Sequence, residues 1–126
     1  MLVTGAGDLA AWSAAILFPL TGVAGWVLRR YSRGAILTRM RPHFVLGYAV
    51  LAIGTVHGMF AMGAMRAMSR LDVWFAVLAL LGLGLQLFVG LSLQAPGAYR
   101  STLRRWHVVT TWAVAVLIVG HIALTM

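Results

Sequence analysis

The stretch HFVLGYAVLAIGTVH, residues 43–57, decides the fold of this chain, because it is long, uncharged and closed by a histidine at each end. A second stretch, HVVTTWAVAVLIVGH, residues 107–121, repeats the pattern with the same fourteen-residue separation, and the chain has no other histidine. Fourteen residues are two heptads, so both histidines of a pair are expected on the same seam of a left-handed helical bundle. At a rise of about 1.5 Å per residue they lie roughly 21 Å apart along the helix axis.

The composition predicts an integral membrane protein of a single domain, residues 1–126. Of the 126 residues, 62% are hydrophobic and only 10% are charged, which is too few for the surface of a soluble domain. The net charge of +8 comes from ten arginines that border the apolar segments, so no nucleic-acid partner is expected. Cysteine is absent, which excludes disulfides, thiolate metal sites and covalent haem attachment.

Hydropathy and turn signals predict four membrane spans, at about Leu9–Leu28, His43–Met65, Leu71–Gln94 and His107–Met126. The expected fold is therefore an all-α membrane protein, a four-helix up-down bundle surrounded by the lipid bilayer. The histidines lie on the second and fourth spans. These two spans are 64 residues apart in register, which hints at an internal duplication.

The arginines predict the orientation in the membrane. The loops after the first and third spans carry eight arginines and the loop between the second and third spans carries two, Arg66 and Arg70. The positive-inside rule then places both termini on the non-cytoplasmic side, in a bacterial cytoplasmic membrane. Spans two and four run parallel in this topology, so His43 is level with His107 and His57 with His121.

The four histidines are interpreted as axial ligands of two non-covalent b-type haems. Ionisable residues within a membrane are costly and usually functional, and the spans hold no interior acid to pair with the histidines. His43 and His107 are expected to bind an inner haem, and His57 and His121 an outer haem. Two alternatives stay open: histidines that only satisfy helix interfaces, and a zinc or copper site, for which Met59, Met62 and Met65 are candidate thioether ligands.

The surroundings of the histidines suit a flat macrocycle. Small residues follow the ligands along the face of span two, at Gly47 and Gly54, and further glycines stand at positions 22, 25, 82, 84 and 90. Arg41, Arg104 and Arg105 flank the inner histidines and are candidates to bind haem propionates. Each ligating ring is expected to donate its other N–H to a helix carbonyl or a threonine.

The paired histidines on the second and fourth helices resemble the di-haem core of membrane b-type cytochromes. The cytochrome b of quinol-oxidising bc complexes places its ligands on these two helices, and the cytochrome b561-like and ferric-reductase-like families use related spacings. The resemblance covers essentially the whole chain. The chain lacks glutamate, and hence the Pro-Glu-Trp-Tyr segment of the bc-complex quinol site, and it lacks the flavin or nicotinamide domain of ferric reductases.

The expected function is transmembrane electron transfer, as a relay or anchor subunit of a larger respiratory or redox complex and not as an enzyme on its own. Partner redox subunits are implied. Exchange with a quinone is a further prediction that would use Tyr48, Thr55, Gln86, the arginines or a partner's residues, since no buried carboxylate is expected as proton acceptor. The alternatives are a small four-helix transporter, which would typically need a membrane-embedded acid, and a non-redox membrane anchor.

Overall fold

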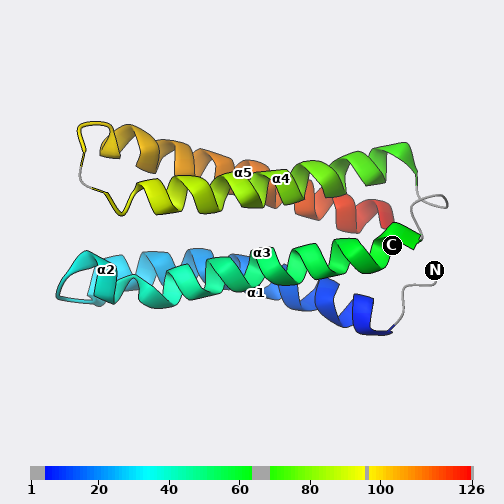
Figure 1. Ribbon diagram of the computed structural model, residues 1–126, viewed down its shortest axis with the longest axis horizontal. Coiled ribbons are helices and arrows are strands. Elements are labelled where there is room, and N and C mark those ends of the chain that lie inside the picture. The colour runs from blue at the N-terminus through cyan, green and yellow to red at the C-terminus, as the bar shows by residue number, and fades with distance from the viewer. Residues whose placement is uncertain (1–4, 64–68, 96, 126) are drawn as a thin grey trace. The chain divides into compact units, whose positions relative to one another are not determined.

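The computed structural model describes residues 5–63, 69–95 and 97–125 (Figure 1). Within these residues the protein is helical and has no strand. The helices are α1 (Gly5–Tyr31), α2 (Ile36–Arg39), α3 (Arg41–Ala61), α4 (Arg70–Ser92) and α5 (Arg100–Thr125). Four of them, all except the short α2, are long and apolar enough to cross a membrane. The predictions of an all-α fold and of four helices able to span a membrane are thereby confirmed for the described residues.

The helix ends differ from the expected spans because a helix continues past the apolar core of a bilayer into the polar interface. α1 includes Arg29 and Arg30 in its last turn, and α5 begins at Arg100, a full seven residues before His107. α3 begins at Arg41 with Pro42 in its first turn, where the missing N–H of proline has no cost. α3 ends at Ala61, and the expected end of this span, Met65, lies outside the described residues.

The chain divides into two compact units, residues 1–60 and residues 61–126. In the N-terminal unit, α1 and α3 lie side by side (Figure 1). His43 near the start of α3 is bonded to Thr21 in the second half of α1, and His57 near the end of α3 is bonded to Gly7 near the start of α1. This crossed order shows that the two helices are antiparallel.

The C-terminal unit is a second antiparallel pair, formed by α4 and α5. Asp72 at the start of α4 bonds to His121 near the end of α5, and Gln86 bonds to His107 in the first half of α5. Two glycines allow close approach: Gly82 faces Val114, and Gly120 faces the ring of Phe75. Small residues at such contacts are how membrane helices gain van der Waals packing without a hydrophobic driving force.

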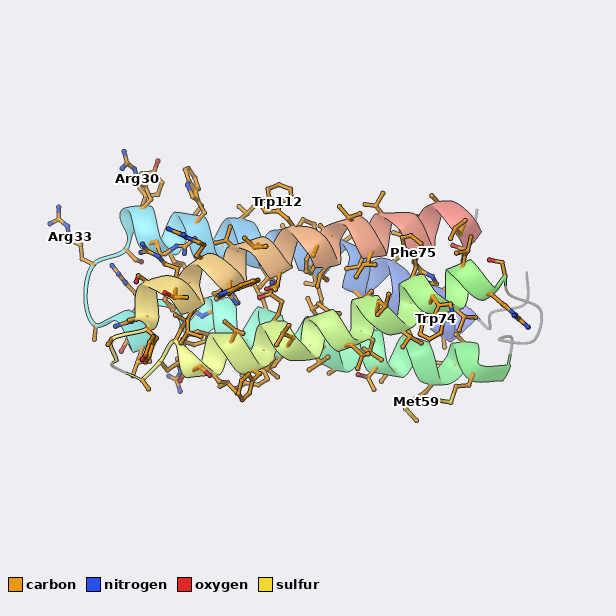
Figure 2. All side chains as sticks on the ribbon, turned by 90° about the horizontal axis from the view of Figure 1, so that it is seen from above. Arg30, Arg33, Met59, Trp74, Phe75 and Trp112 are labelled. Atoms are coloured by element: carbon orange, nitrogen blue, oxygen red, sulfur yellow. The ribbon has the colours of Figure 1, made fainter. Side chains whose placement is uncertain are left out.

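The large apolar side chains are mostly on the outside of the helices. Trp112 is 71% exposed and Met59 is 64% exposed, and both side chains point away from the ribbon in Figure 2. Arg30 and Arg33 extend from the end of α1 and the loop that follows it (Figure 2). An apolar exterior with charges at the helix ends is the arrangement that a bilayer requires.

Candidate functional site: four histidines on two helices

His43 is fixed from α1 by one hydrogen bond and one glycine. Its Nδ1–H donates to the carbonyl oxygen of Thr21 at 2.9 Å. Gly25, one turn further along α1, is buried, and a Cβ built there would lie 2.9 Å from Nδ1 and 3.2 Å from Cε1 of His43. The ring therefore occupies the space that any larger residue at position 25 would fill. Gly25 was expected to leave room for a macrocycle; in the structure it leaves room for the imidazole of His43, and the clearance for a macrocycle stays a prediction.

His57 repeats the arrangement at the other end of the same helix pair. Its Nδ1–H donates to the carbonyl oxygen of Gly7, which is buried, at 3.2 Å. Gly7 and Thr21 are fourteen residues apart, as are His57 and His43. The expected donation of the second ring N–H to a helix carbonyl is thus confirmed for both histidines of α3.

His121 has an acid partner, and this corrects two expectations from the sequence. Its Nδ1–H donates to Oδ1 of Asp72 at 2.5 Å, and the side chains of His121 and Asp72 are 19% and 4% exposed. The sequence predicted no acid for the histidines and no buried carboxylate. Asp72 is the third residue of α4, so it looks like a boundary residue in the sequence, but the antiparallel pairing buries it against the end of α5.

His107 is tied to α4 through its backbone. Gln86, which is 9% exposed, donates its Nε2–H groups to the carbonyl oxygen of His107 at 2.8 Å and to Oγ1 of Thr111 at 2.7 Å. The Thr111 hydroxyl donates to the same carbonyl at 2.6 Å. A Cβ at Gly90 would lie 3.6 Å from Cε1 of His107, an ordinary contact. Gln86 thus anchors the turn of α5 that carries the ligand candidate.

The ring hydrogen bonds of three histidines decide which of their nitrogens carries the proton. Carbonyl and carboxylate oxygens only accept, so Nδ1 is the protonated nitrogen of His43, His57 and His121. A neutral imidazole protonated at Nδ1 carries its lone pair on Nε2, which is the nitrogen that binds a metal in such a ring. The donor set therefore fits the axial ligation of haem iron, in which each iron takes one nitrogen from each of two histidines.

The other predicted site residues have less defined surroundings. A Cβ at Gly47 would meet nothing within 4 Å, and the same holds at Gly22 and Gly84. Gly54 is half-buried on α3. Arg41, Arg104 and Arg105 are exposed near the starts of α3 and α5, within three residues of His43 or His107 in sequence.

Two of the three candidate thioether ligands are on the outside of the chain. Met59 and Met62 are exposed, while Met65 and Arg66 lie outside the described residues. Within residues 5–63, 69–95 and 97–125, no group of three or more His, Cys, Asp or Glu side chains comes together to hold an ion.

The sequence did not predict which residues are the partners of the histidines. Asp72 and Gln86 are fourteen residues apart on α4, as Gly7 and Thr21 are on α1. Each histidine pair therefore faces a second pair of positions at the same spacing on the neighbouring helix. This equal spacing follows from the equal rise of two antiparallel helices, and the acceptors on α1 are backbone carbonyls, so residue type did not mark them in the sequence.

Comparisons with known proteins give no match: no protein-family model, curated protein or solved structure resembles the chain significantly.

Proposed function

We propose that the protein is a membrane electron-transfer subunit that holds two b-type haems without covalent attachment. His43 and His107 would ligate the inner haem, on the cytoplasmic side, and His57 and His121 the outer haem. The observation that carries the proposal is the repeated ring geometry: three of the four histidines donate Nδ1–H to an oxygen of the neighbouring helix within their own unit.

The fourteen-residue repeat supports ligation over simple helix packing. A histidine that only ties two helices together can stand at any position where a partner oxygen is available. Here the same fourteen-residue spacing occurs in both histidine-bearing helices. Such a repeat is expected where two flat groups of equal size are held at two depths of a membrane.

The residues around the histidines orient and isolate them. The bonds to Thr21, Gly7 and Asp72 hold the rings in one tautomer and one rotation, so little reorganisation accompanies a change of charge nearby. In a bilayer, the apolar exterior of the four long helices would keep water away from the proposed haem ligands. Arg41, Arg104 and Arg105 are placed in sequence to neutralise anionic groups at the inner boundary.

A haem with histidine at both axial positions supplies one-electron transfer with little ligand movement and leaves no open iron site for oxygen chemistry. The chain would thus act with partner subunits that deliver and remove electrons at the two membrane faces. We further propose that any quinone exchange uses polar groups near His107. The Oε1 atom of Gln86 is buried and has no hydrogen-bond partner within the described part of the chain, so it is available as an acceptor for a quinol hydroxyl.

A reduced-minus-oxidised visible spectrum of the purified full chain, with pyridine haemochrome quantitation, tests the proposal. Two haem b groups per chain are expected for the natural sequence. His57→Leu should retain one, whereas the matched control Thr55→Val, an exposed position on the same helix, should retain two. A natural chain that binds no haem when expressed with haem supply would overturn the proposal and leave the histidines as helix-packing residues.

The His57→Leu variant also distinguishes an electron-relay function from that of a non-redox anchor. If the chain only anchors its partners, the His57→Leu protein should still assemble a complex with undiminished electron flow across the membrane. Loss of that flow, with the complex intact on a native gel, is the result expected of a relay.

A further inference from the structure

We propose that Asp72 sets the reduction potential of the outer haem and makes it lower than that of the inner haem. The inference rests on the proposed function, because it concerns the haem that His57 and His121 would ligate. Asp72 acts through His121 and is therefore a positioning residue, not a ligand. The observation behind it is the contact between the ring of His121 and Asp72, which is one of the two acids of the chain.

The contact between Asp72 and His121 is short, buried and structurally enforced. Oδ1 of Asp72 lies 2.5 Å from Nδ1 of His121, and Asp72 as a whole is 3% exposed. Ser69 is the N-cap of α4 and its Oγ accepts the backbone N–H of Asp72, which fixes the first turn of the helix. The positive end of the α4 dipole favours a negative charge at this position.

The ring hydrogen bonds of His43 and His57 are to neutral groups. His43 and His57 donate to the backbone carbonyls of Thr21 and Gly7, at 2.9 Å and 3.2 Å. A carboxylate is a stronger acceptor than a carbonyl, and in a medium of low dielectric the difference grows. The imidazole of His121 therefore gains more electron density at Nε2 than those of His43 and His57.

A more basic axial ligand stabilises the oxidised iron more than the reduced iron. The negative charge of the carboxylate acts in the same direction, because ferric haem carries one more positive charge than ferrous haem. Both effects lower the potential of the outer haem. The two proposed sites are then unequal although their ligands are chemically identical, and the inequality favours reduction of the inner haem at equilibrium.

Potentiometric titration of the purified full chain at one fixed pH tests the inference. The natural sequence should show two one-electron steps. Asp72→Asn keeps the shape of the side chain and a hydrogen-bond acceptor but removes the charge. It should raise the midpoint potential of the lower step by about 59 mV, which is a tenfold change in the equilibrium constant of a one-electron reduction. The upper step should stay in place. Electron paramagnetic resonance of the ferric protein should show a change in one of two low-spin signals.

Two further variants are compared with Asp72→Asn. Asp8→Asn removes the only other acid of the chain, in the first turn of α1 next to Gly7, without touching His121. It should move the lower step much less than Asp72→Asn, which separates the hydrogen bond from a general charge effect. Asp72→Glu restores the carboxylate and should return the lower step toward its natural position.

The possible results are distinct. If both haems bind in Asp72→Asn and neither step moves, or if Asp8→Asn moves the lower step equally, the inference is wrong while the proposed function stands. If Asp72→Asn and Asp72→Glu both lose one haem, Asp72 only shapes the binding site, and the inference is wrong again. If Asp72→Asn alone loses a haem and Asp72→Glu keeps both, the carboxylate is needed to bind the haem and not to set its potential, and the inference is wrong. Absence of haem from the natural chain would overturn the proposed function itself.

Discussion

At the scale of single residues, the position of His43 depends on an atom that Gly25 lacks. The imidazole ring reaches the Thr21 carbonyl across the backbone of α1 at the point where a side chain would otherwise stand. A Cβ 2.9 Å from Nδ1 is closer than ordinary van der Waals contact allows. Because both sides of this contact belong to regular helices, the ring has to move if position 25 gains a methyl group.

We expect Gly25→Ala to reduce haem content from two per chain to about one, through displacement of His43 from its hydrogen bond. Alanine is the better helix former, by about 1 kcal/mol, so helicity should not fall. Gly22→Ala is the matched control, because a Cβ at Gly22 meets nothing within 4 Å. Pyridine haemochrome quantitation with far-ultraviolet circular dichroism checks both. Two haems with unchanged spectra in Gly25→Ala would contradict the assignment of His43 as a ligand.

At the scale of elements, the pairing of α4 with α5 is specified by small residues against large ones. Gly82 lies against Val114, which is almost fully buried, and Gly120 lies against Phe75. The polar bonds of Asp72 and Gln86 fall on either side of these contacts along α4. Close packing in the middle and hydrogen bonds toward the ends fix the register of the pair, and this register brings Asp72 to His121.

We expect Gly82→Leu to destabilise the pair by about 1–3 kcal/mol, the usual cost of overpacking. A Cβ at position 82 would lie 2.5 Å from Cγ2 of Val114, so the helices must separate or shift. Gly84→Leu, two residues further on where a Cβ meets nothing within 4 Å, serves as control and should be close to neutral. Thermal unfolding of both variants in the same detergent measures the difference. Equal melting temperatures for the two would contradict the packing described for α4 and α5.

At the scale of the whole molecule, the distribution of arginines predicts how the chain crosses the membrane. Eight arginines belong to the loops after the first and third spans and two to the loop between the second and third. Four helices are long and apolar enough to span in the part of the chain that the structure describes. Because successive spans alternate in direction, spans two and four are expected to be parallel in either orientation. The orientation decides which membrane face each proposed haem would lie near.

Alkaline phosphatase fused after residue 126 is expected to be active, and the same enzyme fused after Arg33 inactive, since it folds only outside the cytoplasm. Fusions to green fluorescent protein at the same two points should give the opposite result, fluorescent after Arg33 and dark after residue 126. The positive-inside rule is the physical basis. A reversed pattern would show that both termini face the cytoplasm and would exchange the inner and outer assignments of the haems.

The class of protein, the four apolar helices and the fourteen-residue histidine spacing were all determined by the sequence alone. These properties are local or periodic: a span needs only a run of apolar residues, and two residues on one helix keep their spacing whatever surrounds them. The donation of ring N–H groups to helix carbonyls was predicted as well, because a buried donor has few other partners in an apolar segment.

Only the tertiary structure decided which atoms meet these rings. Asp72 looked like a boundary residue beside Arg70, and Gly25 like one glycine among fourteen, until the pairing of helices was known. Which residue of one helix faces which residue of another depends on the rotation and axial shift of both. Those two quantities are set by packing along the whole length of a pair, so no single stretch of sequence specifies them.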